Sequence, residues 1–265
     1  MDLGLTGKIA VVTGGSRGMG LAIAKRLAAE GVHVAICARD ASALETAAEV
    51  ISGETGQRPL TMTCDLSSAV EVDAFITKVI ETYGGIDILV SNVGGPPRSP
   101  FMEITDEVWE HWFQLTFMSY VRLVRQVVPS MRQRGGGHIL TIGSNSSINP
   151  IREFSLSNAL RLGVWGLVRT LTDELGKDNI RATMLSPGRI ATERYLAANA
   201  RRAEKSGLSL EQVADRAKGS IPLGRIGDPA EIADAVAFIV SDRAAYFSGS
   251  NFTLDGGLTS SGRDS

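Results

Sequence analysis

The chain has 265 residues, of which 43% are hydrophobic and 21% are charged, and its formal net charge is −2. This length suits one large α/β domain with a sizeable core. The charge balance offers no basic field to attract nucleic acid or an anionic membrane surface. No apolar stretch reaches membrane-spanning length, and the N-terminus lacks a secretory pattern, so we expect a cytoplasmic protein.

Short β-rich runs alternate with helical patterns along the whole chain. The predicted strands are 9–13, 33–38, 60–64, 86–91, 137–143, 180–185 and 251–254, and the predicted helices are 21–30, 41–53, 69–83, 106–134, 157–175 and 228–241. This alternation predicts an α/β fold: a single doubly wound Rossmann domain over residues 1–258, with a seven-stranded parallel sheet and helices on both faces. Residues 259–265 have the composition of a polar tail.

Two segments stand out from this rhythm. The predicted helix 106–134 carries aromatic and aliphatic residues at helical spacing, which indicates core or subunit interface. Segment 191–222, rich in Ala, Arg, Glu and Lys, is inserted after the sixth strand, at the edge of the sheet where ligands bind in such folds. We interpret it as a helical lid; a solvated helical surface element is the alternative.

The cysteines give no indication of a metal or redox site. Cys37 and Cys64 fall in apolar, strand-like runs without Cys-x-x-Cys or Cys/His spacing. We therefore expect buried free thiols and no metal.

A glycine-rich loop directly follows the first strand, and it predicts a dinucleotide site. Gly14, Gly18 and Gly20 stand where a side chain would clash with phosphates or forbid the backbone angles. A helix begins near Met19, so its amide N–H groups face the pyrophosphate, with Ser16 in the same loop. The strand before and the helix after make this pattern specific.

The end of the second strand indicates which nucleotide is bound. An acidic residue there would hydrogen-bond the ribose and repel a 2′-phosphate, but the position holds Ala38, followed by Arg39. Arg17 in the glycine loop adds a second cation. Because guanidinium groups pair with phosphate in a bidentate fork, these residues favour NADP(H) over NAD(H). A surface arginine at a strand end is the plainer alternative.

The loop, read as TGxxxGxG, resembles that of the short-chain dehydrogenase/reductase family, and the similarity extends over almost the whole chain. Among subfamilies, residues 221–225 and 255–257 look most like β-ketoacyl-carrier-protein reductases. The resemblance implies further cofactor contacts from an adenine pair, a turn after the fourth strand and a nicotinamide loop: Asp65, Leu66, Asn92, Gly94, Pro187, Gly188, Ile190 and Thr192.

The resemblance also implies four catalytic positions, which family members fill with Ser, Tyr, Lys and Asn. In this chain they hold Ser144, Ser157, Arg161 and Thr116, so the proton-donating phenol is missing. An aliphatic hydroxyl is a far weaker acid than a phenol and its side chain is shorter. Arg161 keeps a charge beside the nicotinamide ribose, where it would bind the ribose, but it cannot release its proton.

Two functional hypotheses follow from this mismatch. The first is an NADP(H)-dependent oxidoreductase acting on a small-molecule carbonyl or activated double bond, with Ser144 orienting the substrate oxygen and Arg161 stabilising developing negative charge. The second is a nucleotide-binding sensor or partner subunit with little or no turnover. Polar residues that could replace the proton donor, Tyr195 first, are Tyr195, Tyr120, Arg152, Glu153 and His111. The resemblance further implies a homotetramer.

Overall fold

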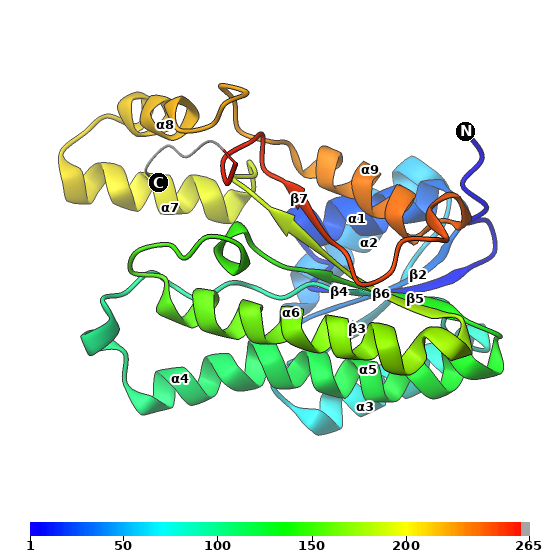
Figure 1. Cartoon of the computed structure of the whole chain (residues 1–265). Coiled ribbons are helices and arrows are strands. Elements are labelled where there is room, and N and C mark those ends of the chain that lie inside the picture. Colours follow the sequence, from blue (N-terminus) through cyan, green and yellow to red (C-terminus); the bar gives the residue numbers. More distant parts are fainter. Residues whose placement is uncertain (261–265) are drawn as a thin grey trace.

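The computed structural model describes residues 1–260. Seven parallel strands form one sheet in the order β3-β2-β1-β4-β5-β6-β7, and helices cover both of its faces (Figure 1). The α/β fold and the seven-stranded parallel sheet predicted from the sequence are therefore confirmed. The strands are β1 (Ile9–Thr13), β2 (His33–Ala38), β3 (Leu60–Thr63), β4 (Ile88–Ser91), β5 (Gly137–Ile142), β6 (Ile180–Pro187) and β7 (Asn251–Leu254).

Each strand–helix step has a local cause in the sequence. The carboxylate of Asp40 accepts a hydrogen bond from the amide of Ala43 and begins one helix, and Ser68 caps the next in the same way. The helices are α1 (Gly18–Ala29), α2 (Ala41–Thr55), α3 (Ala69–Tyr83), α4 (Asp106–Phe113), α5 (Ser119–Gln133), α6 (Ser155–Leu175), α7 (Glu193–Ser206), α8 (Leu210–Gly219) and α9 (Pro229–Val240).

The core forms two layers, one on each face of the sheet. Alternate residues of β1 point to opposite faces, so Val12 packs with the α1 and α9 side chains and Val11 packs with those of α3 and α5. Both residues are fully buried. Burial on both faces explains why these strands are apolar throughout instead of alternating.

The predicted helix 106–134 is helical up to Gln133, but it is not a regular α-helix throughout. A π-helical turn at Gln114–Met118 separates α4 from α5. None of the residues of α4 is buried, whereas Tyr120 and Leu123 of α5 lie in the core. The apolar stripe therefore serves the core only in its second half. A π-turn adds a residue to the helical turn, which shifts the face that follows, and such turns are frequent at functional sites.

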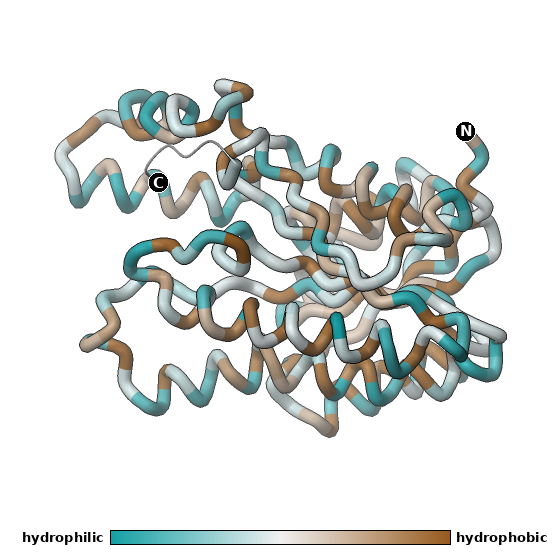
Figure 2. Tube along the Cα trace, in the orientation of Figure 1, coloured by the Kyte–Doolittle hydropathy of each residue, from teal (hydrophilic) through white to brown (hydrophobic). Residues whose placement is uncertain are grey.

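The inserted segment after β6 folds into α7 and α8. Figure 1 shows both helices, in yellow, projecting past the end of β6, and hydrophilic residues recur along them in Figure 2. Within residues 1–260, no helix is both long and apolar enough to cross a membrane. Most of the predicted polar tail, residues 261–265, lies outside the described residues.

Candidate nucleotide-binding and active site

The loop between β1 and α1 depends on glycine at several positions. Gly14 and Gly18 have φ angles of +60° and +56°, in the left-handed region that favours glycine. At Gly20 the obstacle is space: a Cβ atom there would lie 2.1 Å from the carbonyl oxygen of Gly14. The loop therefore keeps its shape because no side chain intervenes between it and the first turn of α1.

Asn92, at the end of β4, holds this loop in place. Its side-chain amide donates to the carbonyl oxygens of Thr13 (3.1 Å) and Gly14 (3.3 Å). The hydroxyl of Thr13 in turn donates to the backbone oxygen of Asn92 and accepts from its amide, both at 2.9 Å. Thr13, which the sequence analysis did not single out, is thus half of a reciprocal pair that couples the first and fourth strands.

The segment after β6 closes against the same loop from the other side. Gly188 donates its amide to Leu254 on β7, and a Cβ at Gly188 would lie 2.6 Å from Asp255. Thr192 caps α7 by accepting from the amide of Tyr195 at 3.3 Å. A methyl carbon of Thr192 lies 3.2 Å from where Gly18 would carry a Cβ. Gly18, predicted to face the pyrophosphate, and Thr192, predicted to contact the nicotinamide end, therefore meet at the N-terminus of α1.

The two arginines predicted to select a 2′-phosphate have different surroundings. Arg17 forms an ion pair with Asp40 at 2.9 Å, and both side chains are more than half exposed. This carboxylate, missed in the sequence analysis although it directly follows Arg39, compensates part of the Arg17 charge. Arg39 lies near enough to Asp65 for its positive charge to lower the pKa of that carboxyl group.

Asp65 and Leu66 follow β3 on the edge of the sheet next to β2. Burial raises the pKa of Asp65, but hydrogen bonds from the amide and hydroxyl of Ser67, with the charges of Arg39 and His111, outweigh it and lower the pKa overall. Asp65 therefore stays ionised at neutral pH. Leu66 is 7% exposed and packs in the core layer of α3 and α5.

The predicted catalytic serines lie together beyond the end of β5. Ser144 is half-buried, and its hydroxyl accepts from the amide of Ser146 at 3.1 Å and donates to the side chain of Asn145 at 3.3 Å. Ser157, only 2% exposed, lies 2.9 Å from the hydroxyl of Ser146. Ser146 thus joins the two positions, a contact that depends on the loop and not on any sequence spacing.

Arg161 is a buried cation held by backbone oxygens. It is 7% exposed, and its two terminal nitrogens donate to Ile142 at the end of β5 and to Val93 after β4. Burial, and secondly repulsion from Arg194, lowers its pKa to about 10, so it remains charged at neutral pH. Arg161 thus lies between the ends of β4 and β5, and two of its five N–H donors are used structurally.

Thr116 and Tyr120 are both enclosed. The hydroxyl of Thr116, in the π-helical turn, is buried and has no hydrogen-bond partner among the described residues. Tyr120 is 1% exposed within the core, and burial raises the pKa of its phenol. Its place in the core layer argues against the role of proton donor that the sequence left open for Tyr120.

The remaining candidate donors differ in accessibility. The hydroxyl of Tyr195 is buried and unpartnered among the described residues. His111 lies on exposed α4 against Trp112, and Arg152 and Glu153 are exposed in the loop before α6. Of these side chains, Tyr195 belongs to the segment that closes on the glycine loop. Both cysteines, Cys37 and Cys64, are free and buried, as the sequence analysis predicted.

A parallel sheet in this strand order, with a glycine loop joining β1 to α1, has the architecture of doubly wound dinucleotide-binding proteins. A family model described as enoyl-(acyl carrier protein) reductase matches residues 14–259. Human "dehydrogenase/reductase SDR family member 4" is 32% identical over 97% of this chain and 89% of its own length. The chain belongs to the short-chain dehydrogenase/reductase family, whose members are NAD(P)H-dependent oxidoreductases.

Other relatives share this extent of similarity. A putative ketoacyl reductase of Streptomyces coelicolor is 31% identical over 95% of this chain and 97% of its own length. The crystal structure of L-sorbose reductase from Gluconobacter frateurii, complexed with NADPH and L-sorbose, has a TM-score of 0.94 and 35% identity, covering 98% of this chain and 99% of that one. An actinorhodin polyketide ketoreductase with NADPH has a TM-score of 0.91 and 31% identity, covering 98% of this chain and 99% of that one.

Proposed function

We propose that this protein is an NADP(H)-dependent oxidoreductase acting on a small molecule. The loop that Asn92 fixes, and that Thr192 closes from the opposite side, is the observation that carries the proposal. Arg39 after β2 and Arg17 directly before α1 support the 2′-phosphorylated nucleotide. The solved relatives that are complexed with NADPH support the same choice.

The catalytic residues favour a substrate that needs little help from an acid. In this proposal the hydroxyl of Ser144 would turn from Asn145 to donate to a substrate oxygen, and the charge of Arg161 would stabilise negative charge that develops nearby. Ser157 is bonded to another serine and is too weak an acid to replace a phenol. Bound NADPH would supply the hydride. An activated double bond or quinone therefore suits the site better than a simple ketone, since water can complete the protonation.

We propose that α7 and α8 act as a lid and that Tyr195 is the first candidate for a protein proton donor. Lids that close over a cofactor exclude water and complete a site. The unpartnered hydroxyl of Tyr195 is free to bond a ligand that enters beneath α7. If Tyr195 donates a proton, Tyr195→Phe lowers kcat strongly while the Kd of NADPH is unchanged. Equal kcat values for the two proteins would exclude this role.

The proposed function is tested by calorimetric titration with NADPH and NADH, followed by single-turnover oxidation of bound NADPH. The substrates are β-ketoacyl thioesters, quinones and enones. We expect tighter binding of NADPH than of NADH and oxidation by enones or quinones. Absence of nucleotide binding would contradict both this proposal and the alternative below.

The alternative is a nucleotide-binding sensor or partner subunit with little or no turnover. The pairing of Ser157 with Ser146, at the position to which the family resemblance assigns the proton donor, is the observation that favours it. Binding of NADPH without oxidation by any substrate would support it. The double change Ser157→Tyr with Arg161→Lys separates the causes: a gain of ketone reduction shows that loss of the donor was the whole obstacle.

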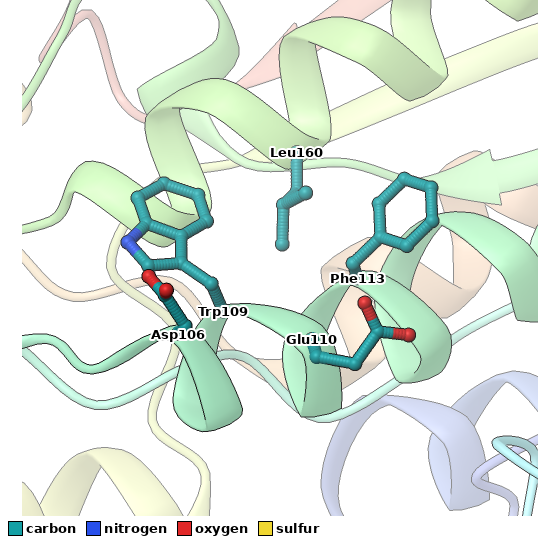
Figure 3. Close-up of a pocket in the computed structure, with 5 residues that line it drawn as sticks. All are labelled: Asp106, Trp109, Glu110, Phe113 and Leu160. Atoms are coloured by element: carbon teal, nitrogen blue, oxygen red, sulfur yellow. The ribbon is translucent and has the colours of Figure 1, made fainter.

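We also propose a homotetramer. Figure 3 shows Trp109 and Phe113 of α4 facing Leu160 of α6. Together with Asp106 and Glu110 these residues line an open hollow of about 320 Å³. Because α4 has no buried residue in the single chain, an apolar face remains for a second copy to cover. Light scattering tests this, and a monomeric mass would contradict it.

A further inference from the structure

Arginines from separate segments converge next to the proposed active site. Arg98 comes from the loop after β4, Arg189 from the loop after β6, Arg194 and Arg202 from α7, and the buried Arg161 from α6. None of these five forms an ion pair with any residue within 1–260. We call them the arginine cluster.

The contacts of the cluster fix its position. Arg194 donates to the carbonyl oxygen of Pro96 at 3.2 Å, and its guanidinium lies 2.9 Å from where Gly95 would carry a Cβ. The guanidinium carbon of Arg98 lies 5.4 Å from the centre of the Phe154 ring. The amide of Ser99 donates to the backbone oxygen of Glu153 at 2.9 Å. The loop after β4 is therefore fastened both to α7 and to the loop that precedes α6 and carries the serines.

The arginines repel one another in two neighbouring groups, Arg98 with Arg189 and Arg202, and Arg161 with Arg194. Burial lowers the pKa of Arg98, and the charges of Arg202 and Arg189 lower it further, against a smaller opposing effect of Glu153. Arg194 has the same secondary effect on Arg161 after burial. The hydrogen bonds of the cluster go to neutral acceptors: Arg189 donates to Ala217, and Arg202 to the side chain of Asn199.

Such an arrangement costs free energy in the empty protein and is relieved by an anion. Arg98, Arg194 and Arg202 are exposed, so a ligand can reach them without unfolding the segment. Arg17 and Arg39, by contrast, lie at the ends of β1 and β2, where they serve the predicted nucleotide phosphate. The cluster belongs to the segments after β4 and β6, which border the serines instead.

We propose that the arginine cluster binds an anionic group, a carboxylate or phosphate, of the molecule that this protein acts on. This inference rests on the proposed function and narrows its substrate to one carrying an oxyanion a few bonds from the reacting carbon. Guanidinium groups recognise both oxyanions through paired, charge-assisted hydrogen bonds. The lid helix α7 would then be drawn onto the site by the ligand that it encloses.

The test compares charged and neutral small ketones by calorimetry on the NADPH-loaded protein. The probes are acetoacetate against methyl acetoacetate, and dihydroxyacetone phosphate against dihydroxyacetone. We expect the charged member of at least one pair to bind roughly tenfold to a hundredfold more tightly, as charge-assisted hydrogen bonds predict. The pair that shows the difference identifies the anion as carboxylate or phosphate.

Matched variants assign the effect to the cluster. The double variant Arg98→Gln with Arg202→Gln should reduce the charged-to-neutral ratio to below about threefold. The control, Lys205→Gln with Arg216→Gln, removes the same charge from exposed positions of α7 and α8 and should leave the ratio unchanged. Equal binding of charged and neutral probes by the wild type overturns the inference. So does a double variant that weakens NADPH binding while the ratio stays as in the wild type, since the cluster would then serve the cofactor.

The same titrations are run without NADPH, so that the two proposals fail separately. If NADPH does not bind, the proposed function is wrong, and the comparison of probes on the unloaded protein still decides whether the cluster binds anions. If NADPH binds and the probes show no preference for charge, only the present inference is overturned.

Discussion

Replacing Gly20 by alanine tests whether the loop after β1 is shaped for a nucleotide. The new Cβ would lie 2.1 Å from the carbonyl oxygen of Gly14 and 2.8 Å from the side-chain nitrogen of Asn92, where ordinary contacts begin at 3.4 Å. The loop and α1 must therefore separate by roughly 1 Å, and overpacking of this kind costs about 1–3 kcal/mol. The amide groups of Asn92 lose their alignment with the Thr13 and Gly14 carbonyls in the same movement.

The effect on cofactor binding should exceed the effect on folding. A phosphate held by two backbone amides gains about 1.5–3 kcal/mol from each, so losing both lowers the affinity for NADPH by roughly a hundredfold or more. Calorimetry measures this affinity and urea unfolding measures the free energy of unfolding. Gly53→Ala is the matched control, because nothing lies within 4 Å of its added Cβ in α2, and it should stabilise the helix by about 0.5–1 kcal/mol. A Gly20→Ala protein that binds NADPH like the wild type would refute the reasoning.

Three further predictions concern pH and nucleotide choice. Burial, with a smaller effect of Arg181, lowers the pKa of His138 well below 6.5, so on acidification the imidazole is protonated in the unfolded chain before it is protonated in the folded protein. The free energy of unfolding should therefore fall by up to about 1.4 kcal/mol per pH unit below pH 6.5. Urea titrations at pH 7 and pH 5 should show this fall for the wild type and not for His138→Leu. Ala38→Asp should shift the ratio of the NADPH and NADH dissociation constants by roughly tenfold towards NADH, because the new carboxylate bonds a ribose hydroxyl and repels a 2′-phosphate. An unchanged ratio would show that another residue selects the nucleotide. Asp40→Ser keeps a cap for α2 but releases Arg17 from its ion pair, so NADPH should bind about twofold to fivefold more tightly. The free energy of unfolding should change little, and weaker binding of NADPH would contradict the assigned role of Arg17.

The predicted elements that carried strong local signals were placed within a few residues. The run 9–13 became β1 with the same bounds, because an apolar strand buried on both faces ends where the glycine loop begins. The strand predicted from residue 86 begins at Ile88, although the backbone of Asp87 already bonds to Ile9 and His138 on the two neighbouring strands. Helical periodicity alone did not reveal the π-turn at Gln114–Met118, because one inserted residue barely changes the apolar spacing.

In the candidate site, too, features set by local sequence were predictable and contacts between distant segments were not. Glycine positions were predictable, since the need for positive φ or for missing volume is local to the chain. The partners of polar residues were not. Asp40 beside Arg17, Ser146 beside Ser157 and the enclosure of Tyr120 each depend on which segments the fold brings together.

By itself the sequence determined the α/β class, the parallel sheet and the glycine loop, because each of these follows from periodicity or from the steric demands of single residues. Only the tertiary structure decided which groups surround the charged side chains of the site. Arg161 lies between two strand ends with its bonds directed to backbone oxygens, and Arg202, 104 positions after Arg98 in the chain, lies near enough for its charge to lower the pKa of Arg98. Electrostatic interaction depends on distance in space, so no reading of neighbouring residues along the chain contains it.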